Sequence, residues 1–275
     1  MIELIREMFH YPFMLRAFFA GTLIALCASL LGVCLVLKRY SMIGDGLSHV
    51  GFGALALASV LNIAPFALSI PVVIVGAVIM QKISSSGKIG GDAAIALLST
   101  SAMAFGVMII SMTEGMNVDV YNYLFGSILS MSRSDVLLSA ALSAVILILY
   151  AFCYNRIFSV VFDEEFTQAT GTDAKMYNLL ISVITAVIIV LGMKMMGALL
   201  ISSLIVFPSL TSMRVCKTFK SVVISSAVVS VICLWIGITI SYLSAAPAGA
   251  SIVLCNVAAF IAYSLVSVAR RRRKT

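Results

Sequence analysis

The chain has 275 residues, of which 62% are hydrophobic and only 11% are charged. Soluble domains are roughly half apolar and a quarter charged, so this composition excludes a soluble globular protein and predicts an all-α protein that crosses a membrane many times. The net charge of +7 would suit a nucleic-acid-binding protein, but membrane proteins collect basic residues at the cytoplasmic surface, and we expect no nucleic acid as a partner.

Apolar runs long enough to cross a bilayer recur from one end of the chain to the other. Ahead of the first run, residues 1–12 predict a short amphipathic helix on the membrane surface. Nine spans are predicted, at residues 13–37, 43–60, 65–81, 92–112, 134–153, 177–193, 196–213, 221–243 and 247–268. The sixth and seventh are separated only by the sequence GMKMMG at 192–197, so eight spans are the alternative. No segment is polar enough or long enough for a separate soluble domain, and 1–275 is predicted to be a single transmembrane domain.

The basic residues predict how the chain is oriented. With nine spans and the C-terminus inside, the inner segments hold 14 of the 18 lysines and arginines, including the basic tail at 270–275. The outer segments hold Arg6, Arg16, Arg133 and Lys194. Because lysine and arginine favour the cytoplasmic side, we expect the helix at 1–12 to lie outside and the C-terminus to be cytoplasmic.

The most polar segment of the chain lies between the fifth and sixth predicted spans and contains FDEEFTQATGT at 162–172. Asp163 is a candidate N-cap there, and Glu164 and Glu165 suit the positive end of a helix dipole. Gly171 lies where such a helix would end. The pattern predicts a short cytoplasmic helix, either solvated or engaged by a partner.

One ionisable pair lies at the start of the second predicted span, in the sequence KRYSMIGDGLSHVGF at 38–52. Asp45 and His49 are four residues apart, so in a helix both side chains project from one face. Carboxylate and imidazole groups suit divalent metals such as Zn²⁺ and Mn²⁺, and ionisable groups in spans usually mark a pathway. A two-fold dimer would supply two of each, enough for a four-ligand site. The alternatives are that Asp45 is an N-cap and His49 a hydrogen-bonding group between helices.

Three stretches of the sequence together resemble one protein family. They are LLGVCLVLKRYSMIGDGLSHVGFGALALA, GMKMMGALLISSLIVFPSLTSMRV and SYLSAAPAGASIVL. In content, order and spacing they resemble the membrane permease subunits of bacterial ABC importers for zinc and manganese. The pattern G-D-x-L-S-H is the most specific part of the resemblance, and Gly197, Pro208 and Arg214 match in the second stretch.

The resemblance implies a type II ABC importer permease, in which two copies form the pathway. Two separate cytoplasmic ATPase subunits bind the permease dimer, and an extracellular or periplasmic metal-binding protein docks on it. By resemblance, Asp45 and His49 match the metal ligands of the pathway. The segment 162–172 is similar to the coupling helix that contacts the ATPase, and Glu165, Ala169 and Gly171 match it best.

The chain itself is not predicted to hydrolyse ATP. The sequence SSSGKI at 84–89 contains Gly87 and Lys88, but no serine or threonine follows and position 82 is Lys82, so the Walker A pattern is absent. With two histidines in the chain, one protomer cannot form the H-E-x-x-H motif of a metallopeptidase either. The prediction is therefore a transport subunit and no enzyme, with no permanently bound cofactor and with ATP on a partner chain.

The predicted function is import of Zn²⁺ or Mn²⁺ across the bacterial cytoplasmic membrane by alternating access. The alternatives are a type II importer for a metal chelate, such as a siderophore or corrinoid, and a proton-coupled secondary transporter. The sequence leaves the choice between zinc and manganese open, since both accept aspartate and histidine ligands.

Overall fold

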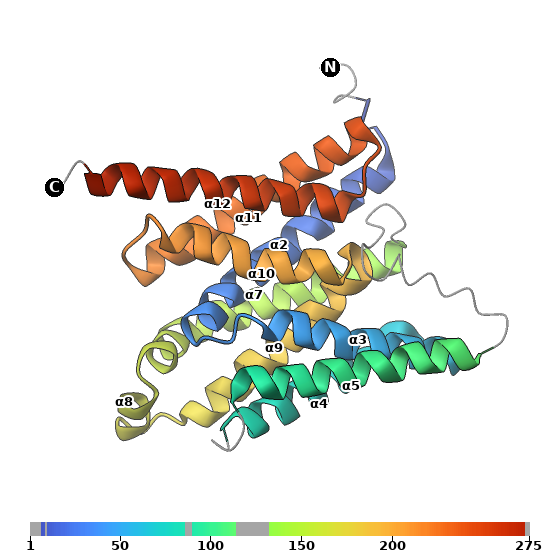
Figure 1. The fold of residues 1–275 in the computed structure, drawn as a ribbon, viewed down its shortest axis with the longest axis horizontal. Coiled ribbons are helices and arrows are strands. Elements are labelled where there is room, and N and C mark those ends of the chain that lie inside the picture. Colours follow the sequence, from blue (N-terminus) through green and yellow to red (C-terminus); the bar gives the residue numbers. More distant parts are fainter. Residues whose placement is uncertain (1–6, 9, 86–89, 114–131, 273–275) are drawn as a thin grey trace.

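A computed structural model describes residues 7–8, 10–85, 90–113 and 132–272, and all secondary structure within them is helical (Figure 1). The helices are α2 (Pro12–Leu37), α3 (Ile43–Val60), α4 (Pro65–Ser85), α5 (Gly91–Met112), α7 (Arg133–Phe162), α8 (Glu164–Ala169), α9 (Ala174–Met196), α10 (Ala198–Met213), α11 (Phe219–Ser244) and α12 (Ala248–Arg272). This confirms the predicted all-α membrane fold. The prediction of a helix at 1–12 falls largely outside the described residues.

Eight of the described helices are long and apolar enough to cross a membrane, and α10, with 16 residues, is a shorter apolar helix. At 1.5 Å per residue α10 is about 24 Å long, less than the roughly 30 Å of a bilayer core. The predicted break between the sixth and seventh spans is confirmed. It falls at Gly197, which separates α9 from α10. The φ of Gly197 is 89°, in a region that favours glycine.

The fifth helix extends far beyond its prediction. A span over 134–153 was expected, but α7 continues to Phe162. Phe158 and Phe162 form an aromatic cluster with Phe219 of α11, with ring centroids 4.8–5.9 Å apart. These contacts stabilise the last turns of α7. Within the segment 162–172, the helix itself is α8, which has six residues and is separated from α7 by Asp163 alone.

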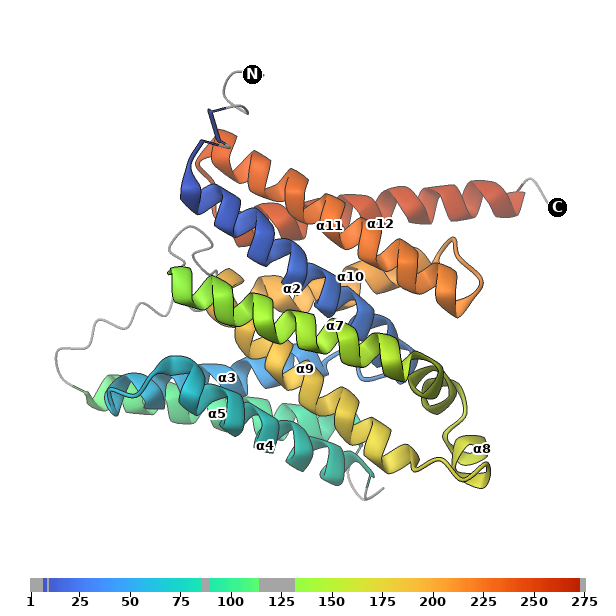
Figure 2. The same cartoon turned by 180° about the vertical axis from the view of Figure 1, so that it is seen from behind.

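The helices form two packed groups joined by α9 and by a contact of α10 with α3. In one group α10, α11 and α12 pack together and α2 contacts α10 and α11, while in the other α3 packs on α4 and α5. Helix α9 contacts members of both groups, and α7 crosses α2 and α9 on the back of the molecule (Figure 2). The C-terminal end of α12 and α8 lie at the same end of the bundle (Figure 1), which is called the α8 end below.

Small polar side chains bind the helices of the first group together. The hydroxyls of Ser209 and Ser226 donate to the backbone oxygen of Ser29 at 3.4 and 3.3 Å, and Ser230 donates to the oxygen of Ala25 at 3.1 Å. All three hydroxyls are buried. In a lipid environment, small residues allow close helix approach and their hydroxyls supply interhelical hydrogen bonds.

Candidate functional site

The Asp45–His49 pair lies in the first two turns of α3. The helix begins at Ile43 with Met42 as its N-cap, so Asp45 is the third helical residue. The interpretation of Asp45 as an N-cap is therefore wrong, although a carboxylate in the first turn still suits the helix dipole. Within the described residues, the one polar partner of the His49 ring is the Asp45 carboxylate, and the alternative of an interhelical hydrogen bond finds no support there.

The two side chains are spaced as two ligands of one metal ion would be. His49 Nε2 and Asp45 Oδ2 are 3.7 Å apart, too far for a hydrogen bond. Zinc–nitrogen and zinc–oxygen bonds measure about 2.0–2.2 Å, so two such ligands at a tetrahedral angle lie about 3.4 Å apart. A small side-chain rotation would therefore bring both atoms to one ion. The side chains are 53% (Asp45) and 22% (His49) exposed, so an ion can reach them.

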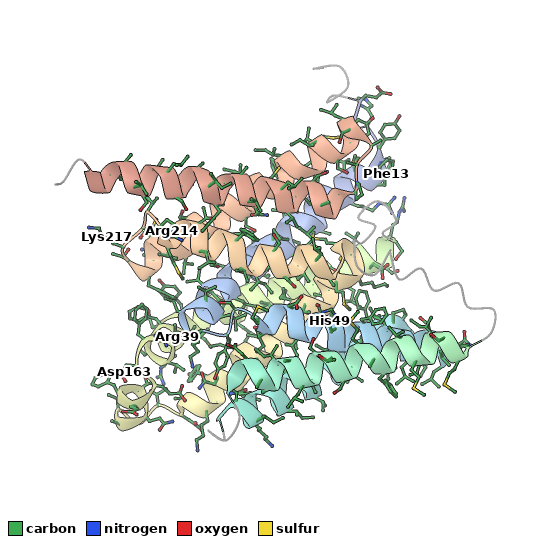
Figure 3. All side chains as sticks on the ribbon, in the orientation of Figure 1. Phe13, Arg39, His49, Asp163, Arg214 and Lys217 are labelled. Atoms are coloured by element: carbon green, nitrogen blue, oxygen red, sulfur yellow. The ribbon has the colours of Figure 1, made fainter. Side chains whose placement is uncertain are left out.

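The opposite faces of α3 are held tightly by its neighbours. A Cβ atom at Gly46 would lie 2.6 Å from Ile95 of α5, and one at Gly51 would lie 2.6 Å from Met193 of α9. Glycine at these positions lets α3 approach both helices closely. The face that carries the pair is left open, and Figure 3 shows His49 between α10 and α5.

The helices beside this open face also expose apolar side chains. On α10, Leu199 and Leu210 are 46% and 36% exposed, and on α5, Leu97 is 58% exposed. Within the described residues there is no group of three or more His, Cys, Asp or Glu side chains that could hold a metal. Two ligands do not complete a tetrahedral site, so the remaining ligands must come from water or from another chain.

Helix α8 is a short, capped helix at the end of the bundle. Asp163 is its N-cap and accepts a hydrogen bond from the Phe166 amide at 2.9 Å, as the sequence predicts. Glu164 and Glu165 occupy its first turn. The helix ends before Gly171, whose φ is 83° and whose amide donates to the oxygen of Gln168.

The outer surface of α8 is exposed and partly aromatic. Glu165 and Ala169 are exposed, as is Phe166, whose side chain is 65% accessible, while Thr167 faces the interior. Exposed aromatic residues are frequent anchors at protein interfaces. Phe166 is a candidate that the pattern of charged and small residues in this segment did not indicate.

Replacing Asp163 with alanine is expected to fray α8, because the Phe166 amide loses its acceptor. Loss of an N-cap costs about 1 kcal/mol, which corresponds to amide exchange roughly five times faster. Hydrogen exchange of peptides covering residues 163–172 would measure this fraying of α8. Asp163→Ser, which keeps an acceptor oxygen, should exchange like the wild type, and equal rates in both variants would contradict the capping role.

Two ion pairs join residues that are far apart in the sequence. Lys194 Nζ lies 2.8 Å from Asp135 Oδ1 and 4.1 Å from the centre of the Phe66 ring, so it ties α9 to α7 and α4. Lys38 Nζ lies 3.2 Å from Glu164 Oε2. Local sequence patterns give no signal for either pair, since the partners are 59 and 126 residues apart.

Eight described helices long and apolar enough to cross a membrane define a multi-pass membrane protein, and two potential ion ligands on an open helix face would suit a transport pathway. Residues 10–267 match the ABC 3 transport family, and the chain belongs to that family. It is therefore a membrane permease of the ABC transporter type.

Named relatives extend over nearly the whole chain. It is 31% identical over 238 residues to the "High-affinity zinc uptake system membrane protein ZnuB" of Buchnera aphidicola, covering 86% of this chain and 91% of the relative. It is 25% identical to the "Manganese import system permease protein ScaB" of Streptococcus gordonii, covering 99% and 98%. Among solved structures, "PsaBC from Streptococcus pneumoniae in complex with Fab" superposes with a TM-score of 0.85 at 26% identity, covering 96% of this chain and 95% of that one.

Proposed function

We propose that this permease imports Zn²⁺ or Mn²⁺ through a pathway in which Asp45 and His49 bind the ion in passing. The observation that carries the proposal is the metal-compatible spacing of the two side chains on the open face of α3. Relatives that are named as zinc and manganese permeases support the same substrate class. A transport site must also release its ion, so its affinity should be modest.

The open face is proposed to meet its own copy in a homodimer. A two-fold axis along α3 would bring two aspartates and two histidines together, which completes the four ligands that one chain lacks. Helices α5 and α10, which contact α3, also expose leucines that a second copy could cover. Asp45 and His49 would supply the polar groups of such an interface, and the leucines would supply its apolar surface.

The α8 end is proposed to face the cytoplasm, with the N-terminus outside. Many described basic residues lie at or near that end: Lys38, Arg39, Lys82, Arg156, Lys175, Arg214, Lys217, Lys220 and Arg270. Lysine and arginine accumulate in this way on the cytoplasmic side. The membrane is then the bacterial cytoplasmic membrane, and a metal-binding protein would deliver the ion to the opposite end.

Helix α8 is proposed to be the coupling helix that docks into a separate ATPase. Asp163, Glu164, Glu165, Ala169 and Gly171 shape or line its exposed surface, and Phe166 is its aromatic anchor. ATP binding and hydrolysis in the partner would displace α8, and the permease would open alternately to each side of the membrane. The permease itself remains a non-enzymatic subunit.

Uptake of ⁶⁵Zn and ⁵⁴Mn by cells that express the permease with its ATPase and binding-protein partners tests this function. We expect one metal to accumulate only when the ATPase is active. Uptake that needs a proton gradient but no ATPase would identify a secondary transporter. Uptake of a siderophore or corrinoid complex, with none of the free ion, would identify a chelate importer.

A further inference from the structure

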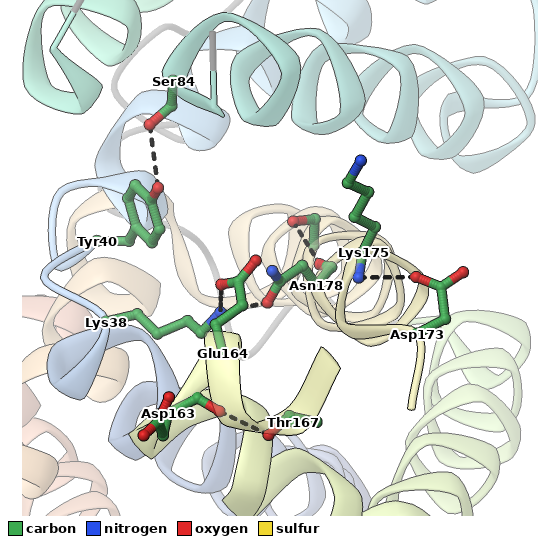
Figure 4. Close-up of polar contacts among 10 residues, drawn as sticks. Lys38, Tyr40, Ser84, Asp163, Glu164, Thr167, Asp173, Lys175 and Asn178 are labelled. Atoms are coloured by element: carbon green, nitrogen blue, oxygen red, sulfur yellow. Dashed lines mark hydrogen bonds and ion pairs between the residues drawn. The ribbon is translucent and has the colours of Figure 1, made fainter. Parts of the chain in front are cut away.

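The Lys38 side chain joins three helices at the α8 end of the bundle. Its ammonium group pairs with Glu164 of α8 at 3.2 Å and also donates to the amide oxygen of Asn178 on α9 (Figure 4). Lys38 itself is the C-cap of α2. Its side chain is only 12% exposed, whereas that of Glu164 is 44% exposed, so the pair is shielded on the lysine side. A shielded charge pair is screened less by salt than a surface pair.

The chain between Lys38 and the start of α3 is short, and backbone hydrogen bonds tie it to both helices. The amide of Arg39 donates to the oxygen of Val36 and that of Tyr40 to the oxygen of Leu35, a Schellman pattern that closes α2. The amide of Ile43 then donates to the oxygen of Tyr40 at 3.1 Å. A displacement of Lys38 must therefore be passed to the first turn of α3, which carries Asp45.

Helix α8 packs against α7 and α9, and α9 in turn contacts α3. Within the described residues, Lys38 is the side chain that forms a hydrogen bond between segment 38–42 and α8. Glu164 is the first residue of α8, so its position follows the helix directly. The Lys38–Glu164 contact is thus the polar connection between α8 and the segment that positions Asp45 and His49.

A cavity beside this contact leaves room for the segment to move. It has a volume of about 310 Å³ and is lined by Lys38, Tyr40, Ile43 and Glu164, together with residues of α4, α5 and α9. Closely packed interiors resist displacement, so free volume on this side of segment 38–42 makes a small shift inexpensive. The hydroxyls of Tyr40 and Ser84, 3.0 Å apart, link the segment to α4 across the cavity.

We propose that Lys38 is a positioning residue that transmits the displacement of α8 to the Asp45–His49 pair. This inference rests on the proposed function, because it assigns a route between the ATPase-contacting helix and the ion ligands. Lys38 touches neither the ion nor ATP. It acts by linking α8 to the start of α3, so that the two segments move together.

The test compares metal transport with ATP hydrolysis in the purified complex of permease and ATPase, reconstituted in proteoliposomes with its metal-binding protein. Lys38→Met keeps an unbranched side chain of nearly the same length and removes its charge. We expect it to hydrolyse ATP at the wild-type basal rate but to move roughly 2- to 30-fold less metal for each ATP hydrolysed, the range measured for coupling residues. Lys38→Arg should retain the wild-type ratio, because arginine also pairs with Glu164.

Matched variants separate transmission from folding. Lys175→Met removes a lysine from the start of α9 whose side chain points away from Glu164 (Figure 4), and it should keep the wild-type ratio. If Lys38→Met fails to assemble, Glu164→Gln takes its place as the test, because that side chain is 44% exposed and glutamine keeps its size. Exchanging the two charges, Lys38→Glu with Glu164→Lys, should restore part of the ratio.

Two outcomes would overturn the inference. One is an unchanged transport-to-hydrolysis ratio in Lys38→Met, or in Glu164→Gln if the former does not assemble. The other is an equal loss in Lys175→Met, which would indicate a general effect of charge. Failure of the proposed function is distinct from both, since the wild-type complex would then move neither ⁶⁵Zn nor ⁵⁴Mn.

Discussion

Replacing Asp45 or His49 with alanine is expected to abolish metal uptake while the permease still assembles with its ATPase. Loss of partners that only orient a metal ligand already costs about 10- to 100-fold, so loss of a ligand itself should lower uptake by roughly 100-fold or more. Both side chains lie on the open face of α3, where Asp45 is 53% and His49 22% exposed, so truncation should leave the helix packing largely intact. Uptake of ⁶⁵Zn and ⁵⁴Mn, with membrane-extracted complex as the assembly check, measures the effect.

The controls for this prediction use the same residue types. His10→Ala removes the other of the two histidines in the chain and should leave uptake unchanged. Asp45→Asn keeps an oxygen ligand without its charge and should fall between wild type and Asp45→Ala. Normal uptake in both alanine variants would mean that the pair is structural and that the pathway lies elsewhere.

Gly32→Ala is expected to destabilise the bundle more than any other glycine-to-alanine change in α2. A Cβ atom at Gly32 would overlap the backbone carbonyl of Ile205 in α10, with the carbonyl carbon and Ser209 Oγ both 2.8 Å away. Backbone atoms cannot move aside like side chains, so α2 and α10 must separate. Overpacking of this kind costs about 1–3 kcal/mol, and each kcal/mol lowers Tm by roughly 2–4 °C in a protein of this size.

Gly21→Ala is the matched control within the same helix. Its Cβ would meet only the flexible ends of Leu234 and Met196, at 3.1 Å each, and alanine improves helix propensity by about 1 kcal/mol. We expect its Tm to stay close to that of the wild type in thermal unfolding of the detergent-solubilised complex. If Gly32→Ala proved as stable as Gly21→Ala, the close contact of α2 with α10 would be disproved.

Much of the fold is visible in the sequence because the bilayer imposes a simple rule. A lipid-exposed backbone must satisfy its hydrogen bonds internally, so each long apolar run becomes a helix. The break at Gly197 and the cap at Asp163 were also predictable, since each depends on the chemistry of one residue in its local segment. The end of α7 was not, because polar residues after 153 suggested a loop while Phe219, distant in sequence, stabilises the helix to Phe162.

In the candidate site, too, local features were predictable from the sequence and long-range contacts were not. Asp45 and His49 are four residues apart, so helix geometry alone placed them on one face. The sequence did not predict that Asp45 is the third residue of α3. The start of α3 depends on how segment 38–42 folds after the end of α2. The Lys38–Glu164 contact brings together residues 126 positions apart, and only tertiary packing makes it.

The most direct test of the proposed shared metal site is the metal content and ligand set of the purified permease in complex with its ATPase. With saturating Zn²⁺ or Mn²⁺, elemental analysis should find one site per two chains, and X-ray absorption should show imidazole nitrogen and carboxylate oxygen ligands. The site should disappear in His49→Ala. An ion retained in His49→Ala, or bound once per chain with no imidazole ligand, would contradict the proposal that two copies of Asp45 and His49 form the pathway site.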